Sequence, residues 1–154
     1  MLPLVFLDVD GVLIPFRARS TLAVPRPLSG NPLLARLDPA DGRRLLTLPA
    51  ELVWATTWMA EANEVIAPLL GLPQLPVVDW ADSDDAPEPR VHWKTAHLAR
   101  WAAGRPFVWL DDEPTDADRR WVAAHHPAPA LLHRVDPTVG LTDEDIATVR
   151  AWLG

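Results

Sequence analysis

Four short groups of residues stand out in this sequence because their side chains could do chemistry together. They are Asp8-Val9-Asp10-Gly11, Thr56-Thr57, Lys94 and Asp111-Asp112. One carboxylate can act as a nucleophile, while a second, two residues further on, carries a proton to or from the reacting groups. Hydroxyl and ammonium groups bind anionic oxygens, and paired carboxylates suit Mg²⁺. These residue types together predict the transfer of a phosphoryl group.

The elements that must position these groups follow from the hydrophobic pattern. Continuous apolar runs, typical of strands buried on both faces, occupy residues 4–8, 52–56, 76–79, 107–111 and 130–133. Helical patterns lie between them at residues 39–46, 58–70, 92–103, 114–125 and 142–153. This alternation predicts an α/β fold, a doubly wound parallel sheet of about five strands with helices on both faces. Asp8, Thr56 and Asp111 then close strands at one edge, where such folds bind ligands.

In this order and on this fold, the four groups resemble the four motifs of the haloacid dehalogenase (HAD) superfamily of phosphohydrolases. The resemblance covers essentially the whole chain and implies one Rossmann-like phosphatase domain over residues 1–154. Members of the superfamily often carry a cap domain after the first motif or before the lysine. Here those segments, 12–37 and 81–91, are too short for a folded domain, so we expect a capless protein with an irregular flap at 12–37.

The resemblance assigns a role to each side chain of the first two groups. Asp8 attacks phosphorus to give an aspartyl-phosphate, and Asp10 protonates the leaving oxygen and then accepts a proton from water. Gly11 allows a tight turn beside the phosphate. Either Thr56 or Thr57 donates a hydroxyl hydrogen bond, and Thr56 is the stronger candidate. The expected reaction is hydrolysis of a phosphomonoester.

The remaining groups supply charge. Lys94 would balance the carboxylates and the phosphate dianion. We expect Mg²⁺ as cofactor, held by Asp8, the backbone carbonyl of Asp10 and a carboxylate of the pair Asp111-Asp112. By resemblance, Asp112 is the more direct ligand, with Asp111 beside it and Asp116 in support.

Three other functions use similar residues. A phospho-accepting receiver domain also combines an acidic cluster, a threonine and a lysine, but there the acidic pair follows the first strand and the acceptor comes later. A true dehalogenase needs neither Asp10 nor the metal carboxylates. A non-catalytic phosphate-binding module would be expected to have lost one of the motif residues, and none is missing here. A phosphatase therefore fits best.

The composition of the chain limits which partners and which chemistry can be expected. The net charge of −7 argues against a broad, nonspecific grip on nucleic acid, and the absence of cysteine excludes disulfides and thiol catalysis. The apolar start, Met1 to Leu7, lacks a basic flank and fits neither a signal peptide nor a membrane span, so we expect a cytoplasmic protein. Lys94 is the only lysine among fourteen basic residues. In a sequence this biased to arginine, that position must need a compact ammonium group.

Two features bear on the substrate. Arg17, Arg19 and Arg26 lie in the segment 12–37, which has no acidic residue, and either form a positive funnel over the site or pair with the acidic loop 81–90. The second feature is aromatic, because Trp58, Trp80 and Trp93 flank the four groups. Their rings either pack in the core or at its rim, or wall a pocket and stack on a base of the substrate. The Trp-Ala-Thr-Thr-Trp sequence of the second motif resembles small bacterial HAD domains, some of them linked with RNA end repair. The positive funnel would suit a substrate with negative charge beyond the scissile phosphate, such as a nucleotide or a nucleic-acid end.

Overall fold

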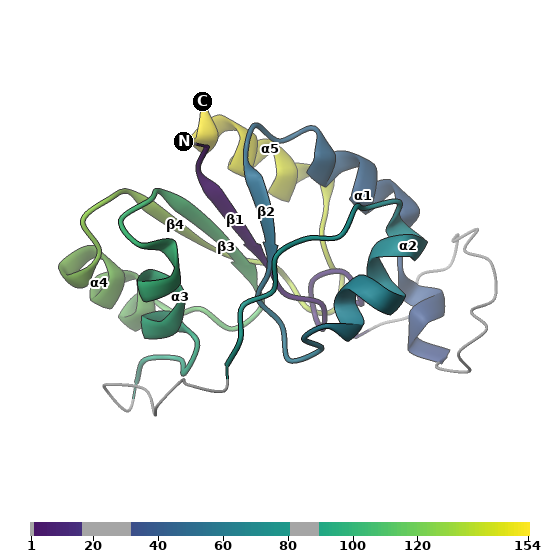
Figure 1. Cartoon of the computed structure of the whole chain (residues 1–154), viewed down its shortest axis with the longest axis horizontal. Coiled ribbons are helices and arrows are strands. Elements are labelled where there is room, and N and C mark those ends of the chain that lie inside the picture. Colours follow the sequence, from purple (N-terminus) through teal and green to yellow (C-terminus); the bar gives the residue numbers. More distant parts are fainter. Residues whose placement is uncertain (1, 17–31, 81–89) are drawn as a thin grey trace.

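In the residues that the structure describes, the strands form one parallel sheet that lies between two layers of helices (Figure 1). The computed structural model describes residues 2–16, 32–80 and 90–154. The strands are β1 (Leu4–Leu7), β2 (Glu51–Trp54), β3 (Phe107–Asp111) and β4 (Ala130–Arg134). They are arranged in the order β2-β1-β3-β4, and every neighbouring pair is parallel. The predicted doubly wound α/β fold is therefore confirmed.

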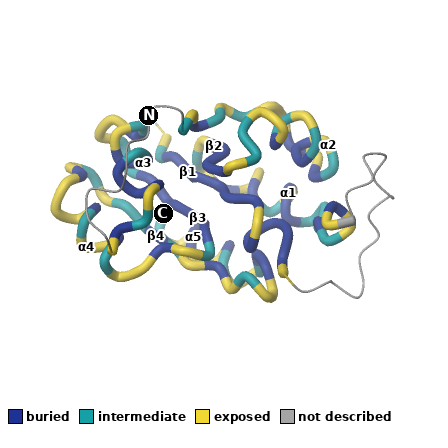
Figure 2. The backbone as a smooth tube through the Cα atoms, turned by 90° about the horizontal axis from the view of Figure 1, so that it is seen from below, coloured by how far each residue is buried: buried dark blue, intermediate teal, exposed yellow. Residues whose placement is uncertain are grey.

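Successive side chains of a strand point to opposite faces, and each face of this sheet packs against its own group of helices. Val5 and Leu7 of β1 belong to the core under α1 (Pro39–Leu46), α2 (Ala67–Leu70) and α5 (Asp143–Leu153). Leu4 and Phe6 belong to the core under α3 (Thr95–Ala102) and α4 (Asp116–His125). Figure 2 shows the central strands β1 and β3 as buried throughout, whereas the edge strand β4 is only partly buried. A sheet buried on both faces explains why its strands are uninterrupted apolar runs.

Polar caps fix where the helices begin, as the sequence predicts. Asp38 caps α1 by accepting a hydrogen bond from the Ala40 N–H at 2.9 Å, with proline following at the first helical position. Thr142 caps α5 in a reciprocal capping box with Asp145. Such caps supply partners for backbone N–H groups that a helix cannot satisfy internally.

The sheet has four strands and not the five that the apolar runs suggest, so that expectation was wrong. Residues 76–79 lie beside β2 but pair with it through a single parallel bridge between Trp54 and Val77. Two hydrogen bonds hold this bridge, from Trp54 N–H to the Pro76 carbonyl and from Val78 N–H to the Trp54 carbonyl, both 2.9 Å long. Pro73 and Pro76 have no N–H to donate, so the ladder cannot extend toward the start of the segment.

The helix expected over residues 58–70 is also interrupted. Residues 57–60 form turns, a π-helical segment follows at Ala62–Ile66, and only Ala67–Leu70 is α-helical. Pro68 explains part of this change, because its ring nitrogen cannot donate to the carbonyl one turn earlier. The altered turn at 57–60 brings Trp58 near the carboxylates described below.

Some sequence predictions fall outside the described residues. Arg17, Arg19 and Arg26 lie there, as does the acidic loop 81–89, so the proposed positive funnel stays a prediction. At the described end of the segment 12–37, a short 3₁₀ helix spans Pro32–Arg36. In the parts of the chain that the structure describes, no helix is long and apolar enough to span a lipid bilayer.

Candidate active site

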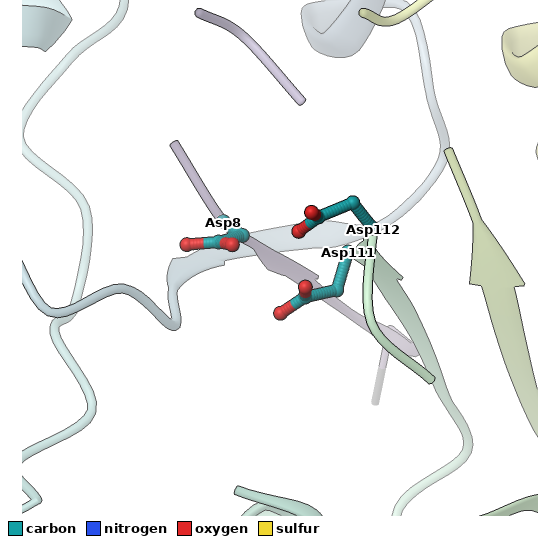
Figure 3. Close-up of side chains that lie close together, drawn as sticks. All are labelled: Asp8, Asp111 and Asp112. Carbon is teal, nitrogen blue, oxygen red and sulfur yellow. The ribbon is translucent and has the colours of Figure 1, made fainter. Parts of the chain in front are cut away.

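Three carboxylates converge at the carboxyl edge of the sheet (Figure 3). Asp8 directly follows β1, Asp111 is the last residue of β3, and Asp112 comes next. The register pairs Leu7 of β1 with Leu110 of β3, so the residues after them lie side by side. One oxygen from each of the three carboxylates lies within 4.8 Å of the others. The structure thus brings Asp8 of the first group together with Asp111 and Asp112 of the fourth.

The turn after Asp8 brings the backbone of Gly11 against Asp112. Gly11 has a φ of +81°, in the left-handed region that glycine adopts without strain. A Cβ atom at this position would lie 2.8 Å from Cγ of Asp112. The Val9 carbonyl holds the turn together by accepting hydrogen bonds from the N–H groups of residues 12, 13 and 14. Gly11 therefore allows a close approach that no other residue permits.

Lys94 lies between the carboxylates. Its Nζ donates to Oδ2 of Asp111 at 3.1 Å and to the carbonyl of Ala55 at 3.0 Å, and lies 3.4 Å from Oδ1 of Asp8. The side chain is buried, which alone would lower the pKa of Lys94. The carboxylates of Asp8 and Asp111 outweigh burial and raise that pKa, so the side chain stays an ammonium ion.

One ammonium group does not balance three carboxylates. Burial raises the pKa of Asp8 to about 8; Lys94 opposes this rise and the neighbouring Asp111 adds to it. Burial, together with the adjacent Asp111 carboxylate, also raises the pKa of Asp112 to about 7. Near neutral pH, Asp8 and Asp112 therefore hold protons that a divalent cation would displace, and the three side chains offer only oxygen ligands. This is the donor set that a hard divalent cation such as Mg²⁺ prefers.

The two carboxylates of the pair have different surroundings. Asp111 is completely buried, and Oδ2 accepts hydrogen bonds from Lys94 and from the indole N–H of Trp109, both at 3.1 Å. Its Oδ1 accepts the backbone N–H of Glu113 at 3.1 Å. Asp112 is only half-buried and faces Gly11. Asp111 is therefore committed to protein donors, whereas Asp112 is more open to a ligand.

The other predicted site residues lie around this cluster. Thr56 is completely buried, and its hydroxyl oxygen accepts the backbone N–H of Trp58 at 3.2 Å, whereas Thr57 is exposed. The carboxylate of Asp10 is also exposed and accepts the indole N–H of Trp58 at 3.2 Å. Asp116 does not join the cluster: its carboxylate is 82% exposed and pairs with Arg119 on the same helix. The expected support from Asp116 is therefore not seen.

Two tryptophans form an aromatic wall beside the cluster. The ring centroids of Trp80 and Trp93 lie 4.9 Å apart in a T-shaped arrangement. Nζ of Lys94 lies 5.8 Å from the first centroid and 5.7 Å from the second, within cation–π range. Trp93 is 37% exposed, so part of its surface is open to solvent at the mouth of the site.

Sequence reasoning missed a buried residue that connects the two halves of the site. Asp118 of α4 is completely buried and accepts the backbone N–H of His92 at 2.7 Å and the hydroxyl of Thr95 at 2.8 Å. Its other oxygen accepts the backbone N–H of Thr115 at 2.8 Å. Asp118 thereby ties the segment that carries Lys94 to the segment that follows the acidic pair. The spacing Thr115-x-x-Asp118, typical of a capping box, was the available signal.

A parallel α/β sheet with an acidic nucleophile candidate after β1, an acidic pair after β3 and a buried lysine between them defines a member of the HAD superfamily. The family described as "HAD domain in Swiss Army Knife RNA repair proteins" matches residues 4–146, and the chain belongs to this family. No curated protein and no solved structure matches the chain. The superfamily that the sequence predicts is therefore confirmed.

Proposed function

We propose that this protein is a metal-dependent phosphohydrolase that removes a terminal phosphate from RNA. The observation that carries the proposal is the convergence of Asp8, Asp111 and Asp112, each with an oxygen within 4.8 Å of the others. The ammonium of Lys94 lies against two of these carboxylates, those of Asp8 and Asp111. RNA is favoured as substrate because the family comprises domains of RNA repair proteins. The capless site predicted from the sequence suits a large substrate whose end alone must enter.

In the first half of the reaction, a carboxylate oxygen of Asp8 attacks phosphorus. The new O–P bond gives an aspartyl-phosphate, and the P–O bond to the leaving group breaks with its electron pair on the leaving oxygen. The carboxyl group of Asp10 donates a proton to that oxygen, so the ribose is released as a neutral alcohol. Asp10 is left as a carboxylate.

In the second half, water attacks the phosphorus of the aspartyl-phosphate. Asp10 accepts a proton from this water, the bond between phosphorus and the Asp8 oxygen breaks, and inorganic phosphate leaves. Both carboxyl groups return to their starting states, so the cycle is balanced without another reactant. The exposed position of Asp10 suits a group that must exchange a proton with solvent-facing atoms.

A divalent cation fits the three-carboxylate cluster, and Asp8 and Asp112 would hold it together with the carbonyl of Asp10. Such a cation supplies neutralisation of phosphoryl oxygens and would return the raised pKa values of both carboxyls to their ordinary range. Asp111 contributes by anchoring Lys94, because both of its oxygens already accept protein donors.

Lys94 offsets the negative charge of the site, and Thr56 binds the phosphoryl group itself. The ammonium lies 3.4 Å from the attacking carboxylate and holds it close to the incoming phosphate. The Thr56 hydroxyl oxygen accepts a backbone N–H, so its own proton is available to donate to a phosphoryl oxygen. These contacts favour the charge that spreads over the phosphoryl group in the transition state.

Phosphate release from RNA oligonucleotides that carry a phosphate at the 5′ or the 3′ end tests the proposal. We expect turnover that depends on a divalent metal and is abolished in Asp8→Asn, because an amide is a poor nucleophile and a poor ligand for a hard cation. DNA ends and small phosphate esters serve as comparison substrates. Substantial turnover by Asp8→Asn would contradict the mechanism. Binding of phosphate ends without release would instead identify a binding module, and stoichiometric phosphorylation of Asp8 without turnover a receiver-like domain.

A further inference from the structure

We propose that Trp58 is a positioning residue for Asp10, which rests on the proposed phosphatase function. The indole N–H of Trp58 donates to Oδ2 of Asp10 at 3.2 Å, although the two residues are 48 positions apart in the chain. This contact fixes the orientation of the carboxyl group and determines which of its oxygens carries the proton that the reaction moves.

The argument begins with the freedom that an exposed carboxyl group would otherwise have. Asp10 is exposed, and the last torsion of an aspartate side chain is broad and roughly two-fold, so either oxygen can face the substrate. An indole nitrogen is a donor only. The oxygen that it contacts is therefore the acceptor, and because the carbonyl oxygen of a carboxylic acid is a better acceptor than its hydroxyl oxygen, this contact favours the proton of a neutral Asp10 on Oδ1.

The structure holds the indole in place by a turn with an uncommon backbone. The backbone N–H of Trp58 donates to the Thr56 hydroxyl at 3.2 Å, and the N–H of Met59 donates to the Thr56 carbonyl at 3.3 Å. Met59 has a φ of +54°, in the left-handed region, which is costly for a residue with a side chain. Such strain persists where surrounding contacts over-determine the conformation, and it often marks functional sites.

Packing adds to this restraint. Trp58 is half-buried and packs against the core that lies under α1, α2 and α5. Its ring is thus supported on one side while its N–H reaches the site. A water molecule in the same place would donate or accept equally well and would not select one oxygen of Asp10. A supported indole donates to the same oxygen, Oδ2, at every turnover.

The consequence for catalysis is specific to proton transfer. With Oδ2 held by Trp58, Oδ1 donates the proton to the leaving oxygen and later accepts one from water. Without the indole N–H, a fraction of Asp10 carboxyl groups presents the wrong oxygen at each turnover. This loss affects leaving groups that need a proton, such as an alcohol, and spares an aryl oxide that departs without one.

Replacing Trp58 with phenylalanine tests the proposal, because the change keeps an aromatic ring and removes the donor. The quantity to measure is kcat/KM, which reports on the formation of the aspartyl-phosphate, for an alkyl phosphate and for a nitrophenyl phosphate. We expect kcat/KM for the alkyl substrate to fall roughly tenfold or more, as for a lost hydrogen bond to an ionisable group, with little change for the aryl substrate. The ratio of the two values is the readout, because general damage to the site lowers both.

Trp54→Phe is the matched control. The Trp54 indole N–H donates to the side chain of Asn63 at 2.9 Å, so this variant also loses one indole hydrogen bond in the same segment, but none to Asp10. Its alkyl-to-aryl ratio should equal that of the wild type. In an Asp10→Asn background, Trp58→Phe should change the ratio no further, because the two residues act as a unit. An equal ratio in Trp58→Phe and wild type, or a full additional loss in the double variant, would overturn the proposal.

A second measurement serves if Trp58→Phe does not fold. In protein labelled with ¹⁵N-tryptophan, the Trp58 indole N–H should shift and exchange faster with solvent in Asp10→Ala, while the Trp54 indole N–H stays unchanged. An unaffected Trp58 resonance would refute the contact. Failure of the wild type to release phosphate from any substrate would refute the proposed phosphatase function. An active enzyme whose alkyl-to-aryl ratio is the same in Trp58→Phe would refute only the role of Trp58.

Discussion

Gly11→Ala should weaken the binding of Mg²⁺ by more than its effect on the stability of the fold can explain. Two independent effects follow from the structure at this position. The first is backbone strain, since alanine at a φ of +81° costs about 1–2 kcal/mol. The second is steric, because the new Cβ would meet Cγ of Asp112 at 2.8 Å. Only the second effect concerns the carboxylate cluster.

The size of the steric effect follows from the contact distance. An ordinary contact begins at about 3.4 Å, so the Asp112 carboxylate must retreat by roughly 0.6 Å. Metal–oxygen distances tolerate a displacement of only about 0.2 Å. We therefore expect the affinity for Mg²⁺ to fall roughly 10–100-fold, as it does when the support of a metal ligand is removed.

Gly71→Ala is the matched control for this experiment. Gly71 ends α2 with a φ of +70°, and apart from its two chain neighbours no residue comes within 4 Å of a Cβ built there. Both variants should lose about 1–2 kcal/mol of unfolding free energy, measured by chemical denaturation in the presence of a chelator. Only Gly11→Ala should also lose the increase in melting temperature that Mg²⁺ produces. The same variant alone should lose phosphate release.

Two results would refute this reasoning. If Gly11→Ala bound Mg²⁺ as tightly as Gly71→Ala, the close approach of Gly11 to Asp112 would have no part in metal binding. If Gly71→Ala lost its metal response too, the loss would be a general consequence of destabilisation. Calorimetric titration of the folded proteins distinguishes both cases from the expected one.

The remaining predictions concern charge. The pKa values of Asp8 and Asp112 are raised to about 8 and about 7 in the folded protein, which therefore holds protons that the unfolded chain releases above pH 4. In a chelator, the melting temperature should fall as the pH rises from 5 to 8, and Mg²⁺ should oppose that fall; a rise in chelator would contradict the assignment. Lys94→Met should destabilise the protein by about 3–5 kcal/mol in chemical denaturation and abolish phosphate release, because it leaves buried carboxylates without their cation. A variant that kept wild-type stability would show that Lys94 is not needed to balance these charges.

Much of the candidate site could be predicted because it depends on local pattern and on one rule of parallel sheets. Each strand is a short apolar run, and residues after neighbouring parallel strands must lie together. Asp8 and Asp111 meet for that reason alone. Lys94 was conspicuous by composition, as the only lysine, although nothing local in the sequence places it between these two carboxylates.

The errors arose where hydrophobic pattern and hydrogen-bonding capacity disagree. Residues 76–79 are apolar enough for a strand, but Pro73 and Pro76 cannot donate to a ladder, so a single bridge remains. In the same way, Pro68 explains part of the departure from a regular helix across residues 58–70. At both places the missing N–H group of proline has more effect on the local structure than the hydrophobic pattern has.

Other parts of the site could not be predicted because they depend on tertiary contacts. The capping-box spacing of Asp118 indicates a helix start, but not that its second oxygen also binds the segment of Lys94. Trp58 and Asp10 are likewise distant in sequence and meet only through the unusual turn at residues 57–60. Neither contact leaves a periodic signal, because each is made once between two segments of different elements.

The position of Lys94 explains why a lysine persists in a sequence whose other basic residues are all arginine. Its ammonium group has three N–H donors, and three oxygens surround it, from Asp8 at 3.4 Å, Asp111 at 3.1 Å and the Ala55 carbonyl at 3.0 Å. An ammonium ion is a compact point charge that can direct its donors to all three. A guanidinium group is planar and larger, and its donors lie in one fixed plane, so it cannot direct them to these three oxygens in the same way. The composition of the whole chain and the geometry of one buried atom thus lead to the same conclusion: this position requires lysine.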